Sequence, residues 1–149
     1  LVAAALWDVR TLRIPNALVS GIALGWVAQG ALSFPGLETV VLSVAAALAV
    51  LLVGIVLFAQ GWLGAGDAKL LAAAALWVGP EGFGLLVVLT GLLGGAMALV
   101  MLVVRARGLD LLLGPHSAAI RTGAVPYAVA ISGATIVTLQ AVPAAILMG

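Results

Sequence analysis

The sequence predicts an all-α, polytopic membrane protein with about six transmembrane helices. Hydrophobic residues make up 65% of the 149-residue chain and charged residues only 7%, whereas a soluble domain carries roughly 25% charged residues. The apolar residues fall into six runs that Gly, Pro and charged residues separate. Every Lys and Arg falls in alternate connectors between these runs. We expect one membrane-embedded domain over residues 1–149.

The first half of the chain contains three apolar runs. Residues 1–7 would cover only roughly 10 Å as a helix, so we expect the first helix to be N-terminally incomplete in this sequence. The polar stretch "DVRTLRIPN" follows, and its Pro15 is placed to stop or restart a helix. The second run is residues 16–33. The turn "SFPGLE" then leads to the third run, residues 38–60, which is long enough to span a bilayer.

The second half contains three more runs. "GWLGAG" precedes the fourth run, residues 67–79, which would cover roughly 20 Å as a helix and ends at "GPEG". The fifth run is residues 83–104. A long polar connector then leads to the sixth run, residues 124–148. Because the fourth run is short, we expect its first residues to lie slightly below the membrane surface, in a notch that water can reach.

The distribution of charge predicts how the helices are oriented. The odd-numbered connectors hold all six basic residues, which are Arg10, Arg13, Lys69, Arg105, Arg107 and Arg121. The second and fourth connectors hold only Glu38 and Glu81. Basic connectors face the cytoplasm in most membrane proteins. Asp8 and Asp67 belong to the same side as the basic residues, so we expect both at the cytoplasmic face.

Asp67 follows the glycines Gly64 and Gly66 and opens the strongly helix-forming stretch "AKLLAAAAL". The simple interpretation is a helix N-cap, for which Asp is well suited. That role does not account for the two glycines, which indicate positive φ or a close approach of another backbone. Capping and catalysis are compatible, since a helix N-terminus stabilises an ionised carboxylate.

Asp8 lies near the end of the first helix, where the helix dipole disfavours an anion. An ion pair with Arg10 or Arg13 is one explanation. The other explanation is a functional role, because an acid that is retained at an unfavourable position at a membrane boundary is usually functional.

Two carboxylates that share one proton can perform peptide hydrolysis. Both cannot ionise cheaply when they are close, so one holds the proton. The ionised carboxylate takes a proton from water, and the protonated one donates to the carbonyl oxygen under attack. The helix-end arguments make Asp67 the ionised base and Asp8 the protonated acid.

Three segments resemble a known family. "GAGDAK" fits the GxGD motif of intramembrane aspartic proteases, and "DVRTLRIPN" is similar to the first-aspartate motif of bacterial type IV prepilin peptidases. "VPYAVAISGA", residues 125–134, resembles the Pro-Tyr segment of that family's last helix. The three segments occur in the family's order and cover essentially the whole chain.

The resemblance implies an enzyme that removes a leader peptide from prepilins or pseudopilins at the cytoplasmic face of the bacterial inner membrane. It implies that Asp8 and Asp67 are catalytic. No cysteine is present, so the chain looks like the short, peptidase-only branch, as in tight-adherence pilus systems. We expect no cofactor, no metal and no nucleic-acid partner, while membrane lipids surround the protein.

Five residues are candidates for shaping the site or positioning the substrate: Gly64, Gly66, Lys69, Pro126 and Tyr127. Lys69 points away from Asp67 on a helix, and an interfacial lysine that reaches toward water is its simpler interpretation. Pro126 suits the first turn of the last helix. Tyr127 is a candidate hydrogen-bonding group near the site. The only histidine, His116, is expected in a solvated loop.

Two other functions are compatible with these residues. One is a GxGD protease of the presenilin or signal-peptide-peptidase kind, although those enzymes place their first aspartate after Tyr in mid-helix. The other is a small transporter or assembly subunit with an acidic proton site. The position of cleavage would separate the proteases, and a non-enzyme would leave a prepilin uncut.

Overall fold

The computed structural model describes residues 1–11, 13–107 and 127–142, and the described elements are all helices. The helices are α1 (Val2–Thr11), α2 (Asn16–Ser33), α3 (Leu37–Ala59), α4 (Ala65–Ala106) and α6 (Tyr127–Ala141). The all-α class is therefore confirmed. The described part contains five helices, so the count of six transmembrane helices remains a prediction.

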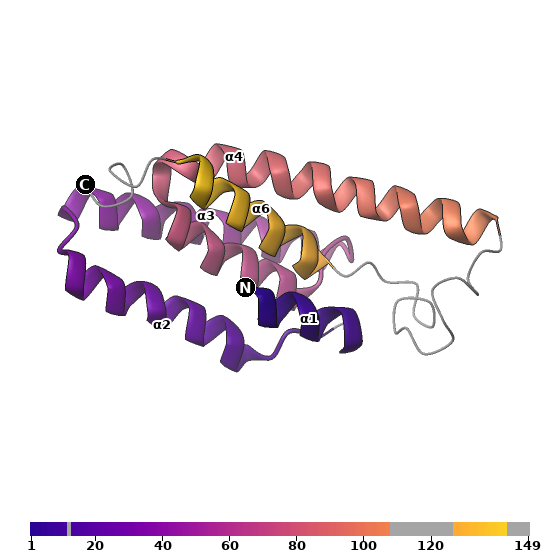
Figure 1. The fold of residues 1–149 in the computed structure, drawn as a ribbon, viewed down its shortest axis with the longest axis horizontal. Coiled ribbons are helices and arrows are strands. Elements are labelled where there is room, and N and C mark those ends of the chain that lie inside the picture. Colours follow the sequence, from indigo (N-terminus) through magenta and orange to yellow (C-terminus); the bar gives the residue numbers. More distant parts are fainter. Residues whose placement is uncertain (12, 108–126, 143–149) are drawn as a thin grey trace.

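Helix α4 is bent sharply in its interior. Gly79 has φ 63° and ψ −172°, a backbone conformation outside the helical region, and Pro80 follows it. The chain reverses direction here, so the two halves of α4 run antiparallel (Figure 1). The "GPEG" stretch, at which the sequence ends the short fourth run, thus contains the reversal that separates the two helical halves of α4. Gly79 is suited to it because residues with a side chain rarely adopt this φ and ψ combination.

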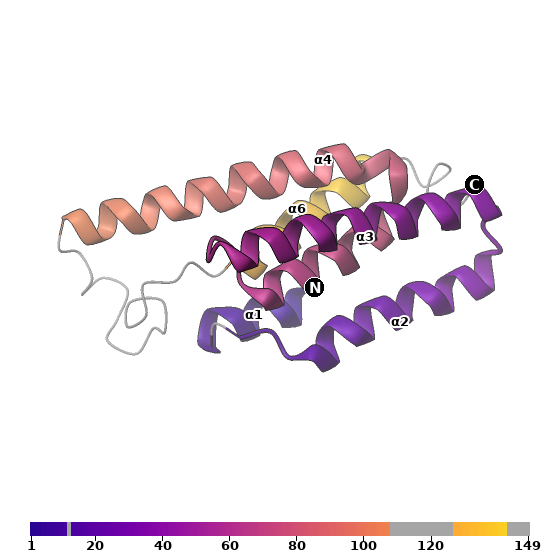
Figure 2. The ribbon, with the colours of Figure 1, turned by 180° about the vertical axis from the view of Figure 1, so that it is seen from behind.

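The first half of α4 is the centre of the bundle. Its buried residues include Leu70, Ala74, Ala75 and Val78, each with 0% exposure. Helices α3, α6 and α2 all pack against α4. In the rear view of Figure 2, α3 lies in front of the first half of α4. The run of small alanines lets the neighbouring helices approach closely, which is how membrane helices commonly pack.

The outer surface of the bundle is apolar. Leu52 in α3 is 65% exposed and Leu99 in α4 is 64% exposed. In the described part, residues Leu37–Ala59 and Ala65–Val104 are long and apolar enough to cross a membrane, and α6 is a shorter apolar helix. Large exposed aliphatic side chains on such helices are expected when lipid is the solvent.

Helix α1 packs on α6, at the other end of the sequence. The Ser132 hydroxyl of α6 donates to the Leu1 carbonyl oxygen at 3.1 Å. Ala4 of α1 is 1% exposed. The sequence assigned residues 8–11 to a polar connector, but α1 continues to Thr11. The Thr11 hydroxyl donates to the Trp7 carbonyl oxygen at 2.9 Å, and the last turn of α1 therefore keeps a hydrogen-bond partner for one of its free carbonyls.

Candidate active site

Helix ends from three parts of the sequence meet at one end of the bundle. They are the C-terminal end of α1 and the N-terminal ends of α4 and α6 (Figures 1 and 2). The first carries Asp8 and the second carries Asp67. The two residues that the sequence predicted to act together are therefore on neighbouring helix ends, on one side of the molecule.

Asp8 is held by the start of α6. Its side chain is 4% exposed, and its Oδ2 accepts a hydrogen bond from the backbone N–H of Ala128 at 3.1 Å. Ala128 is the second residue of α6, so the positive end of that helix dipole faces the carboxylate. The unfavourable end of α1 is thus offset by the favourable end of α6. The N-terminus of α6 thus has the role for which the sequence offers Arg10 or Arg13 as candidates.

Asp67 is the third residue of α4, because the helix begins at Ala65. Asp67 is therefore not the N-cap residue. Its carboxylate instead turns back toward the backbone of Gly64, which is the direction that the third residue takes in a capping box. A Cβ on Gly64 would lie 2.6 Å from Asp67 Oδ2. Glycine at position 64 is therefore required by the carboxylate itself.

Gly66 allows the first motif to approach the second. A Cβ on Gly66 would lie 3.1 Å from the Cβ of Ile14, in the connector that follows α1. Neither Gly64 nor Gly66 has a positive φ; among described glycines only Gly61 and Gly79 do. Of the two explanations that the sequence left open, positive φ is therefore wrong, and the groups that approach these glycines are side chains of the protein itself, Asp67 at Gly64 and Ile14 at Gly66.

The two carboxylates are close enough for their charges to interact. The second oxygen of Asp67, Oδ1, is buried and has no hydrogen-bond partner. Buried polar atoms are nearly always paired, so an unpaired oxygen beside a second carboxylate is suited to hold or receive a proton. The arrangement could activate a water molecule between the two acids.

Lys69 lies beside the site and does not contact Asp67 in any hydrogen bond of the described residues. Its Nζ donates to Asn16 Oδ1 at 3.2 Å, and its side chain is exposed. Asn16 is the last residue of the "DVRTLRIPN" stretch and the first residue of α2. Lys69 therefore joins the two motif segments, a contact that a purely lipid-facing lysine would not make.

Tyr127 packs against the second half of α4. A Cβ on Gly94 would lie 2.7 Å from Tyr127 Cε1, so the ring rests directly on the helix backbone. The ring fixes the first residue of α6, and the next residue is the one that binds Asp8. The other predicted residue of this segment, Pro126, lies outside the described residues, as do His116 and Arg121.

Sequence reasoning missed the Ala128 amide as a site group. A backbone N–H has no side-chain signal, and only Pro126, which suggested a helix start, pointed near it. It also missed Gly54, where a Cβ would lie 2.7 Å from the Cβ of Ala68, next to Asp67. A glycine inside a long apolar run is common in membrane helices and therefore uninformative by itself.

The fold and the site define a helical membrane protein with two interacting carboxylates at one end of its bundle. A comparison with protein-family models matches residues 1–99 to the type IV leader peptidase family. The chain belongs to this family, and it is therefore a peptidase that resides in a membrane. The match includes both aspartates and ends before Tyr127. No curated protein and no solved structure matches the chain.

Proposed function

We propose that this peptidase is an aspartic endopeptidase that removes the leader peptide of prepilin-like substrates through Asp8 and Asp67. The observation that carries the proposal is the meeting of these two carboxylates. They come from α1 and α4 and are close enough for their charges to interact, and Asp8 accepts a hydrogen bond from the N-terminus of α6. Family membership supports a leader peptide as the substrate.

The surroundings of the two acids support a division of roles. Asp8 faces the N-terminus of α6, which stabilises a negative charge. Asp67 has a buried, unpaired Oδ1, and a charge there would be costly without a partner. We therefore assign the proton to Asp67 and the negative charge to Asp8, the reverse of the assignment that helix-end arguments favoured.

In this mechanism the ionised Asp8 takes a proton from a water molecule that lies between the acids. The water oxygen attacks the peptide carbonyl carbon while Asp67 gives its proton to the carbonyl oxygen. The tetrahedral intermediate then collapses: the ionised Asp67 takes a proton from one hydroxyl, the C–N bond breaks, and the amine leaves with the proton that Asp8 had received, which restores both acids. Each step is general acid–base catalysis, and no covalent intermediate with the enzyme is formed.

The backbone before α4 suits the approach of an extended substrate. Residues 60–64 are not helical, Gly61 has φ 75°, and the side chain of Trp62 is 72% exposed. Non-helical backbone at membrane depth is tolerated where it lines a water-accessible cavity. The hydrophobic helix of the pilin would dock in the bilayer beside the enzyme and supply binding energy away from the reacting bond.

The charge pattern supports cytoplasmic cleavage. Arg10, Arg13 and Lys69 are exposed near the two acids, and basic residues favour the cytoplasmic side. We place the enzyme in the bacterial inner membrane as one domain, with a role in pilus biogenesis. Lys69 and Asn16 would hold the two motif segments together while the substrate binds.

Separate Asp8→Asn and Asp67→Asn variants test the proposal. Each is co-expressed with a candidate prepilin, and the new N-terminus is read by mass spectrometry. Loss of either acid should reduce leader removal by at least about a hundredfold, which is the contribution of a general acid or base. Glu81→Gln is the matched control, because Glu81 lies at the α4 reversal, outside the site, and it should retain full cleavage.

Two results would contradict the proposal. If both Asn variants still release the leader, the acids are not catalytic. If the wild-type protein leaves every prepilin intact, a transporter or assembly subunit becomes the better explanation. A cut within the transmembrane part of the substrate, and not at the leader boundary, would instead indicate a protease of the presenilin kind.

A further inference from the structure

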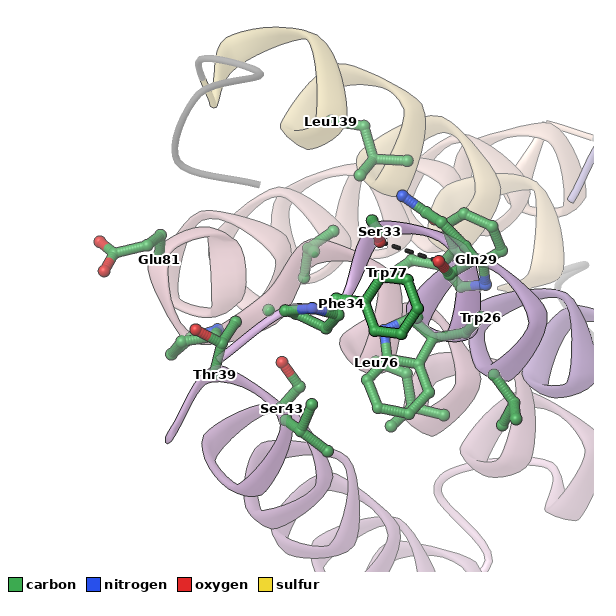
Figure 3. A pocket seen from close by; sticks show the side chains of 17 residues that line it. Trp26, Gln29, Ser33, Phe34, Thr39, Ser43, Leu76, Trp77, Glu81 and Leu139 are labelled. Carbon is green, nitrogen blue, oxygen red and sulfur yellow. Dashed lines mark hydrogen bonds between the residues drawn. The ribbon is translucent and has the colours of Figure 1, made fainter. Parts of the chain in front are cut away.

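A cavity of about 550 Å³ lies at the opposite end of the bundle from the two acids. It is bounded by the C-terminal end of α2, the N-terminal end of α3, the reversal of α4 and Leu139 of α6 (Figure 3). Its volume is within the range of roughly 300–1,000 Å³ that is typical of small-molecule sites. The proposed peptidase mechanism makes no use of it.

Aromatic side chains form much of the cavity wall. They are Trp26 and Phe34 from α2 and its C-terminus, and Trp77 from α4. The Trp77 indole N–H donates to the Ile22 carbonyl oxygen at 2.9 Å, which fixes that ring in the wall. Phe34 has a left-handed backbone, φ 47°, and its N–H donates to the Gly30 carbonyl oxygen. A backbone hydrogen bond thus holds the Trp77 ring, while the Phe34 side chain is 86% exposed at the edge of the cavity.

One buried polar side chain is directed into the cavity. Ser43 is 3% exposed, and Figure 3 shows its hydroxyl pointing toward the cavity, without a hydrogen bond to the residues that line it. A Cβ on Gly79 would lie 3.5 Å from Ser43 Oγ, so the hydroxyl stands beside the reversal of α4. A hydroxyl that faces the cavity from a residue with 3% exposure, and that has no hydrogen bond to the lining residues, suits a ligand with a polar group.

Positive and negative ends of helices face the cavity together. The C-terminus of α2 contributes free carbonyls and the negative end of its dipole, and the N-terminus of α3, near Thr39, contributes free N–H groups. Glu81 stands at the rim, with its carboxylate directed outward. The described Lys and Arg residues belong to the opposite end of the bundle. A ligand that fits carries both a phosphate and an ammonium group.

We propose that this cavity binds a zwitterionic phospholipid, whose headgroup carries both a phosphate and an ammonium group. The phosphate lies toward the N-terminus of α3 and Ser43, since helix N-termini bind phosphate. The ammonium lies among the aromatic rings, which attract cations, with Glu81 beyond it. The first methylenes of the lipid chains cover Leu76 and Val40. The ends of apolar helices, with aromatic residues, are where headgroups lie in a membrane.

The test compares lipids that differ only in the headgroup. The purified full chain in detergent is titrated with phosphatidylethanolamine, phosphatidylcholine and phosphatidylglycerol of identical acyl chains, and bound lipid is measured by native mass spectrometry. We expect phosphatidylethanolamine and phosphatidylcholine each to bind at least about fivefold more tightly than phosphatidylglycerol, because the acidic rim repels an anionic lipid. Equal binding of the three lipids, or preference for the anionic one, would overturn the proposal.

Variants in the cavity separate a built site from general lipid adhesion. Ser43→Ala removes one polar contact with almost no change in volume, and Glu81→Gln removes the charge at the rim. Each should reduce the preference for phosphatidylethanolamine, whereas Leu52→Ala, at an exposed position in α3 outside the cavity, should not. Unchanged preference in both cavity variants would overturn the proposal. The readout is lipid binding, so it stands or fails independently of the proposed cleavage by Asp8 and Asp67.

Discussion

At the scale of single residues, Gly64 controls the position of a candidate catalytic carboxylate. A Cβ would lie 2.6 Å from Asp67 Oδ2, which is shorter than any van der Waals contact, so the carboxylate would have to move. Because the residue is exposed and precedes the helix, the displacement should affect the site much more than the fold.

We expect Gly64→Ala to lower the rate of leader removal by about a hundredfold, the usual effect of misplacing a reacting group by roughly 1 Å. The melting temperature in detergent should change little. Gly21→Ala is the control, because a Cβ there meets nothing within 4 Å and the change should be neutral or stabilise α2 by up to about 1 kcal/mol. Full activity of Gly64→Ala would show that Asp67 does not need its present position.

Gly94 has a comparable role toward the other acid. Its Cβ would lie 2.7 Å from the ring of Tyr127, and pushing that ring moves the start of α6, where the Ala128 N–H binds Asp8. We expect Gly94→Ala to destabilise the protein by about 1–3 kcal/mol and to reduce cleavage further than the stability loss explains. Unfolding in denaturant and cleavage kinetics measure the two effects.

Tyr127→Val should partly reverse the loss of cleavage that Gly94→Ala causes. Replacing the ring by a smaller side chain, in Gly94→Ala with Tyr127→Val, makes room for the new methyl group, so cleavage should recover in part. Gly95→Ala is the neighbouring control, since nothing lies within 4 Å of a Cβ at that position. If Gly95→Ala is as harmful as Gly94→Ala, contact with Tyr127 is not the cause.

At the scale of elements, the reversal in α4 depends on one glycine. Gly79 has φ 63° and ψ −172°, a combination that costs residues with a side chain about 1–3 kcal/mol. We therefore expect Gly79→Ala to lower the free energy of unfolding by that amount, measured by denaturant titration in detergent. Gly84→Ala, five residues later and with nothing within 4 Å of its Cβ, should cause no loss. Equal stability of the two variants would mean that the reversal tolerates other conformations.

Breaker residues predicted most element boundaries but not the contacts between elements. The second run, residues 16–33, coincides with α2, because Pro15 precedes it and the Phe34–Gly36 turn ends it. Helix α1 ends later than the sequence predicts, because the polar residues from Asp8 onward continue the helix to Thr11. "GPEG" was correctly identified as a break, and the reversal of the chain there depends on the φ of Gly79.

In the candidate site, too, the sequence predicts the charged residues but not the contacts that hold them in place. Asp8, Asp67 and the glycines of GxGD could be selected from the sequence because charged residues are costly in apolar surroundings. The packing of α1 on α6 could not be predicted from the sequence, because it depends on Ala4, Ser132 and the Leu1 carbonyl. Small side chains and backbone groups of this kind produce no recognisable sequence pattern in a chain that is rich in alanine and apolar on most of its surface.

At the scale of the whole molecule, the described charges divide between the two ends of the bundle. Arg10, Arg13 and Lys69 are exposed near the candidate active site, while Glu38 opens α3 and Glu81 follows the reversal of α4 at the other end. Figures 1 and 2 show these helix ends on opposite sides of the structure. Basic residues remain on the cytoplasmic side of membranes, so the two ends should face different compartments.

The sequence contains no cysteine, so single cysteines can report which compartment each end faces. Trp62→Cys lies in the connector before Asp67 and Leu37→Cys lies at the start of α3, and both native side chains are more than 70% exposed, at 72% and 79%. A thiol reagent that cannot cross membranes, added to spheroplasts, should label position 37 and leave position 62 unlabelled. Inverted vesicles should give the opposite result, because they expose the cytoplasmic face. Labelling of position 62 from outside the cell would place the two acids on the wrong side for a leader that emerges from the cytoplasm.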